Sequence, residues 1–123
     1  RILFGHHPWT SFGAEGKIKN PATKLDELYK KLVDTGKVDL IISGHENSQQ
    51  HIYIPGKPDM IISGVGGYTH KEDSESQILL AKELKFRSIE AGCVKIDVLR
   101  NELRISFYNT KNNVLYSLKI KKT

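Results

Sequence analysis

Apolar residues recur at helical spacing in one part of the chain. Five of them follow Pro21 on what would be one face of a helix: Leu25, Leu28, Tyr29, Leu32 and Val33. Pro21 suits the first turn of such a helix, and Gly36 suits its end. A helix with one apolar face needs a partner surface, so we expect it to pack against a sheet.

Short apolar runs bounded by polar turns predict strands on both sides of this helix. The chain opens with "RILF", and residues 38–43, "VDLIIS", are apolar almost throughout, which indicates a strand covered on both faces. Two further strands, 51–54 and 59–64, are separated by the tight-turn sequence "PGKP". After a polar loop, residues 78–84 are predicted to form a short helix.

The last third of the chain alternates apolar and polar residues, which predicts antiparallel strands with one buried face. The apolar positions are Val94, Ile96 and Val98, then Leu103, Ile105 and Phe107, then Val114, Tyr116, Leu118 and Ile120. Polar turns at 100–101 and 111–113 separate these runs. The whole pattern predicts an α/β (α+β) layered sandwich with a mixed sheet and terminal antiparallel hairpins.

Length and composition narrow the class of protein. A chain of 123 residues is long enough for one domain and too short for two ordinary ones. The hydrophobic share of 38% and the charged share of 27% are typical of a globular protein. No apolar run reaches the roughly 20 residues that cross a bilayer, so we predict no membrane span. The single cysteine, Cys93, excludes an intramolecular disulfide.

The net charge of +5 raises the question of a nucleic-acid partner. The lysines, however, are spread along the chain, and their one cluster, "KIKK" at 119–122, belongs to a strand alternation. No basic motif interleaved with aromatic residues is present. We therefore predict a solvated basic surface and no nucleic-acid partner.

Two Gly-His pairs stand where apolar runs end. "RILF" is followed by "GHHPWTS", and "DLIIS" is followed by "GHEN". Open α/β folds place ligands at this edge of the sheet, and glycine lets the chain turn sharply there. If the two strands are neighbours, His6 and His45 lie close together, and imidazole is the commonest metal ligand near neutral pH. Either pair alone is uninformative, because neither a helical His-x-x-x-His nor paired cysteines accompany it.

Taken in order, the motifs resemble the C-terminal half of the calcineurin-like metallophosphoesterases, and among them the purple, or tartrate-resistant, acid phosphatases. The resemblance covers "ILFGHHPWTSFGAEG", the amphipathic helix, "DLIISGHENSQQHIY", "MIISGVGG" and the terminal hairpin. It implies that residues 1–123 are the C-terminal part of a single αββα domain whose N-terminal half is absent. It also implies hydrolysis of a phosphate ester by two metal ions, iron, zinc or manganese, in the full-length protein.

The resemblance also implies metal ligands. His6 matches a histidine ligand, and His45 matches the first histidine of the family's Gly-His-x-His motif, both on the same metal. Asn47 replaces the second histidine, a ligand of the other metal, and its neutral amide oxygen is a weaker ligand for a transition metal. The other ligands, including a bridging aspartate, belong to the N-terminal half in this family. The 123 residues alone are therefore expected to be inactive.

Other residues are candidates for the catalytic and substrate-binding parts of the site. Glu15 stands roughly where the family carries a histidine near the substrate phosphate, and a carboxylate there would repel the dianion. His7 either faces the pocket, as a catalytic candidate, or packs beneath it. Tyr68 lies where the family's loop returns toward the site and is the substrate-binding candidate. Trp9 either walls the pocket or packs in the core, and His51 is predicted to be structural.

The replacements at Glu15 and Asn47 also support a hypothesis from another class, a non-catalytic relative that serves as a scaffold or binding protein. Intact Asp-x-His, Gly-Asp and Gly-Asn-His motifs in the N-terminal half would favour the enzyme, and their loss the scaffold. The predicted partners of the enzyme are a phosphorylated small molecule or another phosphoester and the N-terminal half. Acid phosphatases of this branch are often secreted, which suggests a compartment by analogy only.

Overall fold

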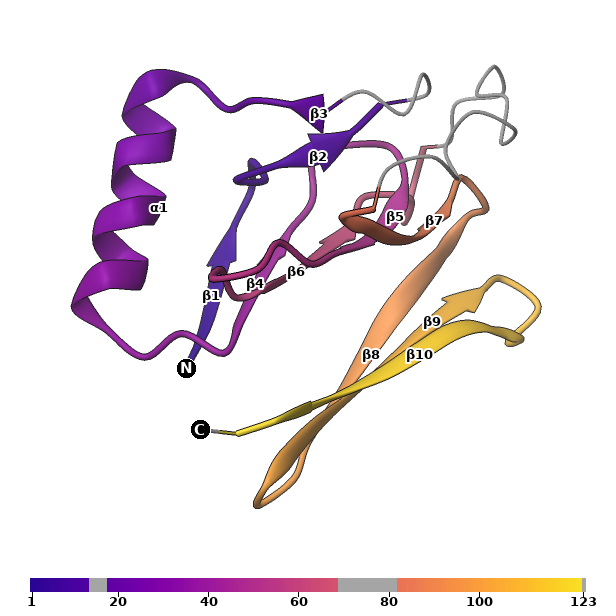
Figure 1. The fold of residues 1–123 in the computed structure, drawn as a ribbon. Helices are drawn as coiled ribbons and strands as arrows, with labels where there is room; N and C mark the ends of the chain where they lie inside the picture. The colour runs from indigo at the N-terminus through magenta and orange to yellow at the C-terminus, as the bar shows by residue number, and fades with distance from the viewer. Residues whose placement is uncertain (14–17, 69–81, 123) are drawn as a thin grey trace.

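A computed structural model describes residues 1–13, 18–68 and 82–122. Within these ranges the chain forms one helix and ten strands, arranged in three sheets (Figure 1). Glu15 lies outside the described residues, as do residues 78–81 of the predicted second helix. The helix predicted for residues 78–84 is wrong at its C-terminal end. Leu84 begins a strand there, pairs with Ile52 and packs against the apolar core.

A five-stranded mixed sheet, in the order β1-β4-β6-β5-β7, forms the centre of the fold. Its strands are β1 (Ile2–Gly5), β4 (Leu40–Ser43), β5 (Gln49–Ile52), β6 (Asp59–Ser63) and β7 (Leu84–Ser88). β1, β4 and β6 are parallel, whereas β5 runs antiparallel to both β6 and β7. Gly5 pairs with Ser43, so β1 and β4 end side by side. β5 begins at Gln49 rather than at the predicted His51.

The helix α1 (Thr23–Thr35) covers one face of this sheet, and a three-stranded antiparallel sheet covers the other (Figure 1). The second sheet contains β8 (Gly92–Val98), β9 (Glu102–Asn109) and β10 (Val114–Lys121). A short ladder joins β2 (Ser11–Phe12) to β3 (Ile18–Lys19). Ile41 belongs to the core on the helix side and Leu40 to the core between the sheets, so β4 is covered on both faces. The predicted fold class is confirmed.

Helix α1 meets the sheet along a narrower stripe than its sequence predicted. Leu25, Tyr29 and Val33 pack against the core. Leu28 and Leu32 are 52% and 40% exposed, because only the row spaced by four residues faces the sheet. The described part of the chain contains no helix long and apolar enough to cross a membrane.

Trp9 packs in the core rather than forming a pocket wall. It is 3% exposed and stacks on Tyr29 with 5.6 Å between ring centroids. Its indole N–H donates a hydrogen bond to the Asp26 carboxylate at 2.8 Å, and the Lys57 ammonium lies 4.2 Å from the ring centroid. Hydrogen bonds from Lys30 and then from this indole lower the pKa of Asp26 below its usual value. These contacts attach the segment after the first Gly-His pair to helix α1.

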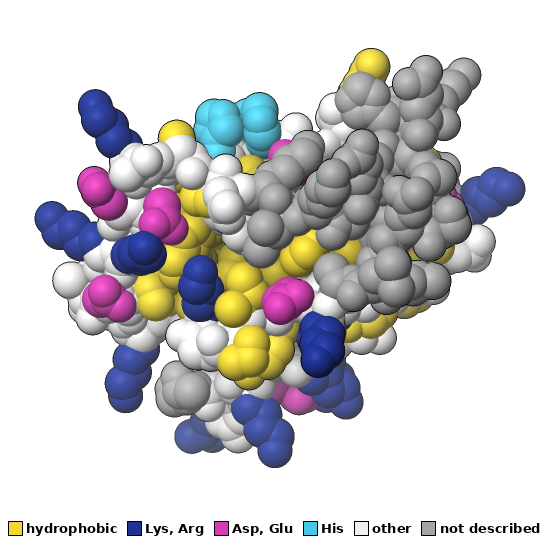
Figure 2. All heavy atoms as spheres, turned by 45° about the horizontal axis from the view of Figure 1, so that its top comes forward, with side chains coloured by type: hydrophobic (Ala, Val, Ile, Leu, Met, Phe, Trp, Pro, Cys, Tyr) yellow, Lys and Arg dark blue, Asp and Glu magenta, His cyan; other side chains and the backbone are white. Residues whose placement is uncertain are grey.

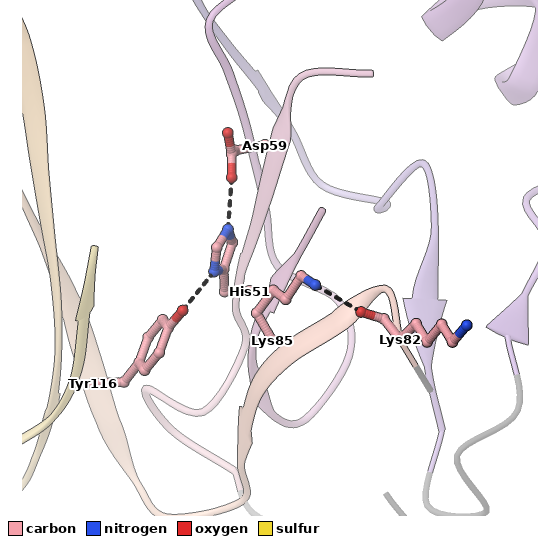
Figure 3. A network of polar contacts seen from close by, with 5 residues as sticks. All are labelled: His51, Asp59, Lys82, Lys85 and Tyr116. Carbon is pink, nitrogen blue, oxygen red and sulfur yellow. Dashed lines mark hydrogen bonds and ion pairs between the residues drawn. The ribbon is translucent and has the colours of Figure 1, made fainter. Parts of the chain in front are cut away.

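His51 is structural, as predicted, and links the two large sheets (Figure 3). Its Nε2 lies 2.6 Å from a carboxylate oxygen of Asp59, and its Nδ1 lies 3.0 Å from the hydroxyl oxygen of Tyr116. Tyr116 comes from β10, so this chain of contacts crosses the core between the sheets. Burial, followed by the nearby Asp59 charge, raises the pKa of Tyr116, which keeps its hydroxyl protonated. Both ring nitrogens of His51 are therefore occupied within the core.

Candidate metal centre

The two Gly-His pairs leave the five-stranded sheet at the same edge. Because β1 and β4 are adjacent and parallel, their carboxyl ends lie together. The Gly44 amide donates a hydrogen bond to the His6 carbonyl at 3.1 Å, which ties one corner to the other. His6 Nε2 and His45 Nδ1 lie 3.3 Å apart. The proximity expected from the sequence is thus present.

His7 joins these two residues. Its ring centroid lies 4.8 Å from that of His6 and 4.4 Å from that of His45. Each of the three histidines offers a ring nitrogen within 4.8 Å of the other two. Among the described residues this is the one such group of histidine, cysteine and carboxylate side chains. Figure 2 shows histidine side chains gathered at the surface, where all three are exposed.

The backbone of the first corner is held by helix α1. The Tyr29 hydroxyl donates a hydrogen bond to the His7 carbonyl at 2.7 Å. It can approach because residue 5 has no side chain: a Cβ on Gly5 would lie 2.7 Å from that hydroxyl oxygen. Burial raises the pKa of Tyr29, so its hydroxyl remains a donor at neutral pH. Close packing thus explains the glycine that precedes the two histidines.

The second corner places a histidine in an unfavourable backbone conformation. His45 has a φ of 64°, in the left-handed region that costs a residue with a Cβ about 1 kcal/mol or more. The turn continues with a hydrogen bond from the Glu46 amide to the Gly44 carbonyl at 2.7 Å and one from the Ser48 amide to the Glu46 carbonyl at 2.8 Å. Such strain is concentrated at functional sites, which supports a role for the imidazole.

We expect His45→Gly to be more stable than His45→Ala by about 1 kcal/mol in its free energy of unfolding. Both variants lose the imidazole, and glycine alone adopts a φ of 64° without a Cβ clash. Urea unfolding of the two variants measures the difference. The same pair of substitutions at Asn112, whose φ is 62° in the turn between β9 and β10, provides a comparison away from the histidines. Equal stability of the two position-45 variants would contradict the expectation.

A hollow of about 470 Å³ opens beside the histidines. Its lining comes from the two corners and from the start of α1: His7, Pro8, Ser11, Asn20, Pro21, Ala22, Lys24, Leu25, His45 and Glu46. The Lys24 ammonium and the N-terminal end of α1 both favour an anion there. The Glu46 carboxylate is held to one side by a hydrogen bond from the Ser11 hydroxyl at 3.1 Å. The hollow is large enough for a small phosphorylated molecule.

Three other residues were predicted for the site: Asn47, Tyr68 and Glu15. Asn47 follows His45 by two positions in the same turn and is half-buried. Tyr68 is 62% exposed and does not appear among the described residues that line the hollow. Glu15 lies outside the described residues. The catalytic, metal-binding and substrate-binding roles of these three residues stay predictions.

Sequence reasoning overlooked a buried glutamine that positions the site. The Gln50 carboxamide accepts a hydrogen bond from the Phe12 amide and donates one to the Phe12 carbonyl, each at 2.9 Å. It also donates to the Ser48 hydroxyl at 2.8 Å. These contacts hold β2, which follows the first corner, against β5, which follows the second. The available signal was a pair of glutamines, 49–50, directly before an apolar strand.

The chain is similar in sequence to known proteins. The chain is 27% identical over 116 residues to "Purple acid phosphatase 4" and 27% identical over 122 residues to "Purple acid phosphatase 7", both from Arabidopsis thaliana. These alignments cover 94% and 99% of the chain but 33% and 35% of the relatives, so the chain spans about a third of their length. No protein-family model matches the chain.

A solved structure shows that the fold occurs elsewhere. The structure titled "GAP50 the anchor in the inner membrane complex of Plasmodium" superimposes with a TM-score of 0.79 at 23% sequence identity. The superposition covers 99% of this chain and 36% of the other. Together with the curated relatives, it confirms the resemblance that the order of the motifs indicated.

Proposed function

We propose that this chain, whose resemblance to the purple acid phosphatases covers nearly its whole length, is part of a metal-dependent hydrolase of phosphate esters. The observation that carries the proposal is the His6–His45 pair, with ring nitrogens 3.3 Å apart at the ends of adjacent parallel strands. Imidazoles this close can bind one ion. Both residues stand at the positions where the family's motifs have metal ligands.

The residues present fit a transition metal, because the exposed side chains are imidazoles, which suit zinc, copper, iron and nickel. In this proposal His6 and His45 hold one ion, and Asn47 contributes to a second. The remaining ligands come from a segment of the same domain outside these 123 residues. When bound, the two ions polarise a phosphoryl oxygen and lower the pKa of a water molecule.

The hollow beside the histidines is the proposed binding place of the phosphate ester. Lys24 and the N-terminal end of α1 attract the phosphate group by their positive charge and partial charge. Ser11 keeps the Glu46 carboxylate engaged in a hydrogen bond, which limits its repulsion of the anion. In the family-based assignment Glu15 opposes the same phosphate, so we expect Lys24 to offset that repulsion.

A non-catalytic scaffold is the second candidate function. It is supported by Asn47 and Glu15, which stand where the resemblance places two histidines of the family. The solved structure with the same fold is titled an anchor, so the fold also occurs in a protein described by its place in an assembly. A scaffold would keep the two cores and the buried His51 link and would have no use for the exposed histidines.

Hydrolysis of an aryl phosphate by the complete gene product, loaded with zinc, manganese or iron, tests the two candidates. We expect His6→Ala and His45→Ala each to lower kcat/KM by about 100-fold or more. Replacing a residue that only orients a metal ligand costs about 10–100-fold, and loss of the ligand itself should cost more. Lys95→Ala, which changes an exposed side chain on β8, is the control and should keep the wild-type rate. A rate equal in the wild type and His6→Ala would reject the hydrolase and favour the scaffold.

The same assay tests Asn47 and the completeness of the site. Asn47→His should raise both the occupancy of the second metal, by elemental analysis, and the rate, because imidazole binds a transition metal better than an amide oxygen does. The gain should vanish when His45→Ala is added. Residues 1–123 alone should show no turnover that depends on His6. Flat metal content and rate in all Asn47 variants would count against a second ion at this turn.

A further inference from the structure

We propose that His7 is a third ligand of the ion held by His6 and His45, so that residues 1–123 bind one transition-metal ion on three imidazoles. The inference rests on the proposed function for the presence of a metal and goes beyond it in what completes the site. The resemblance gives His7 no ligand role, and it assigns the next ligand of this turn, Asn47, to another ion. Here the site is complete enough for binding within the chain itself.

The spacing of the ring nitrogens fits a single ion. In tetrahedral sites imidazole nitrogens lie about 2.0–2.1 Å from Zn²⁺, which separates two of them by about 3.3–3.4 Å. His6 Nε2 and His45 Nδ1 are 3.3 Å apart. The ring of His7 is nearer to that of His45, at 4.4 Å, than the ring of His6 is, at 5.1 Å. Since all three nitrogens lie within 4.8 Å, a movement of roughly 1.5 Å closes the set to tetrahedral spacing.

The backbone of the first corner directs both of its imidazoles to one place. Consecutive side chains of an extended strand point to opposite faces. The rings of His6 and His7 nevertheless lie 4.8 Å apart, edge to face at 87°. Two hydrogen bonds hold this turn: the Gly44 amide binds the carbonyl of His6, and the Tyr29 hydroxyl binds the carbonyl of His7. The turn therefore brings both rings beside His45.

The ligand set selects the class of metal. Three imidazole nitrogens favour zinc, cobalt, nickel or copper over magnesium and calcium, which prefer oxygen ligands. Because the three rings are exposed, a fourth position stays open to water, as in catalytic zinc sites with three protein ligands. A hydrogen bond between His6 and His45 accounts for the 3.3 Å contact alone and gives the His7 ring no role.

Titration of the 123-residue chain with Co²⁺, purified without a histidine tag, tests the proposal. We expect one equivalent to bind, with the visible absorption of a four-coordinate ion. His7→Ala should weaken binding by roughly tenfold or more, as His6→Ala and His45→Ala do. Lys95→Ala and Lys119→Ala, which change exposed side chains on β8 and β10, are controls that should leave the affinity within about twofold of the wild type. Circular dichroism confirms that each variant is folded.

X-ray absorption of the Zn²⁺-loaded protein provides a second readout, with three imidazoles expected in the wild type and two in His7→Ala. An unchanged affinity in His7→Ala, or an equal loss in Lys95→Ala, would overturn the assignment of His7. Neither measurement requires turnover. Binding that depends on His7, together with no hydrolysis by the complete gene product, would leave this inference standing and remove the proposed function. Hydrolysis by the complete gene product that depends on His6, together with normal metal binding by His7→Ala, would support the proposed function and overturn this inference.

Discussion

Gly64→Ala is expected to lower the free energy of unfolding by more than about 3 kcal/mol, or to prevent folding. A Cβ at this position would lie 1.6 Å from the carbonyl oxygen of Glu46 and 2.7 Å from its carbonyl carbon. Both are backbone atoms, so they cannot yield as the end of a flexible side chain does. The Gly64 amide also donates a hydrogen bond to the Ser48 carbonyl at 3.0 Å. The substitution must therefore displace the turn that carries His45.

Gly66→Ala and Gly67→Ala are the matched controls for this prediction. A Cβ at either position would meet nothing within 4 Å among the described residues, and neither glycine has a positive φ. Both variants should stay within about 0.5 kcal/mol of the wild type. Urea unfolding measures all three stabilities, and Co²⁺ titration of any folded Gly64→Ala protein reports on the displaced turn. Equal stability of Gly64→Ala and Gly66→Ala would contradict the close approach of Gly64, the residue after β6, to the Glu46 backbone.

Gln50→Leu is expected to destabilise the chain by about 3 kcal/mol or more, although the two side chains have similar size. Gln50 is fully buried, and its carboxamide is bonded to both the amide and the carbonyl of Phe12. Leucine would leave these two backbone groups buried without partners, at about 1–3 kcal/mol each. Because β2 follows the first corner directly, loosening it should also weaken metal binding by the histidines.

Gln49→Leu is a matched control from the same strand. Gln49 is equally buried, but among the described residues its Oε1 has no hydrogen-bond partner. Its amide makes longer contacts, 3.2 Å to the Tyr108 carbonyl and 3.4 Å to the Cys93 carbonyl. We therefore expect its replacement to cost about 1–2 kcal/mol and to leave Co²⁺ affinity unchanged. Calorimetric unfolding and Co²⁺ titration of both leucine variants test this ranking. A Gln49→Leu variant that is less stable than Gln50→Leu would contradict it.

Local periodicity in the sequence was enough to predict the helix, the central strand and the terminal hairpins. Alternation in the last third predicted β8, β9 and β10, because the apolar face of their sheet packs against Leu40 and Ile61 of the central sheet. The apolar run ending at Ser43 predicted a strand covered on both faces, and both cores contain its residues. The glycine before each histidine pointed to the corners, although at Gly5 close packing against the Tyr29 hydroxyl, and not a turn, excludes a side chain.

The tertiary structure alone decided how these pieces meet. Parallel pairing of β1 with β4 sets the 3.3 Å contact of His6 with His45, and no local pattern encodes which strands are neighbours. The backbone carbonyl of His7 is held by a hydrogen bond from Tyr29, a residue 22 positions away.

Packing also changed what local pattern predicted. The exposed side chains of Leu28 and Leu32 follow from how far the sheet extends under the helix, and β7 forms because its edge is paired by β5. Gln50, polar in sequence, is buried because the Phe12 backbone satisfies its carboxamide. The sequence by itself thus determined helix α1, most of the strands and the histidines at two strand ends. Contacts between segments distant along the chain decided the geometry of the site, because they arise only once the layers are packed together.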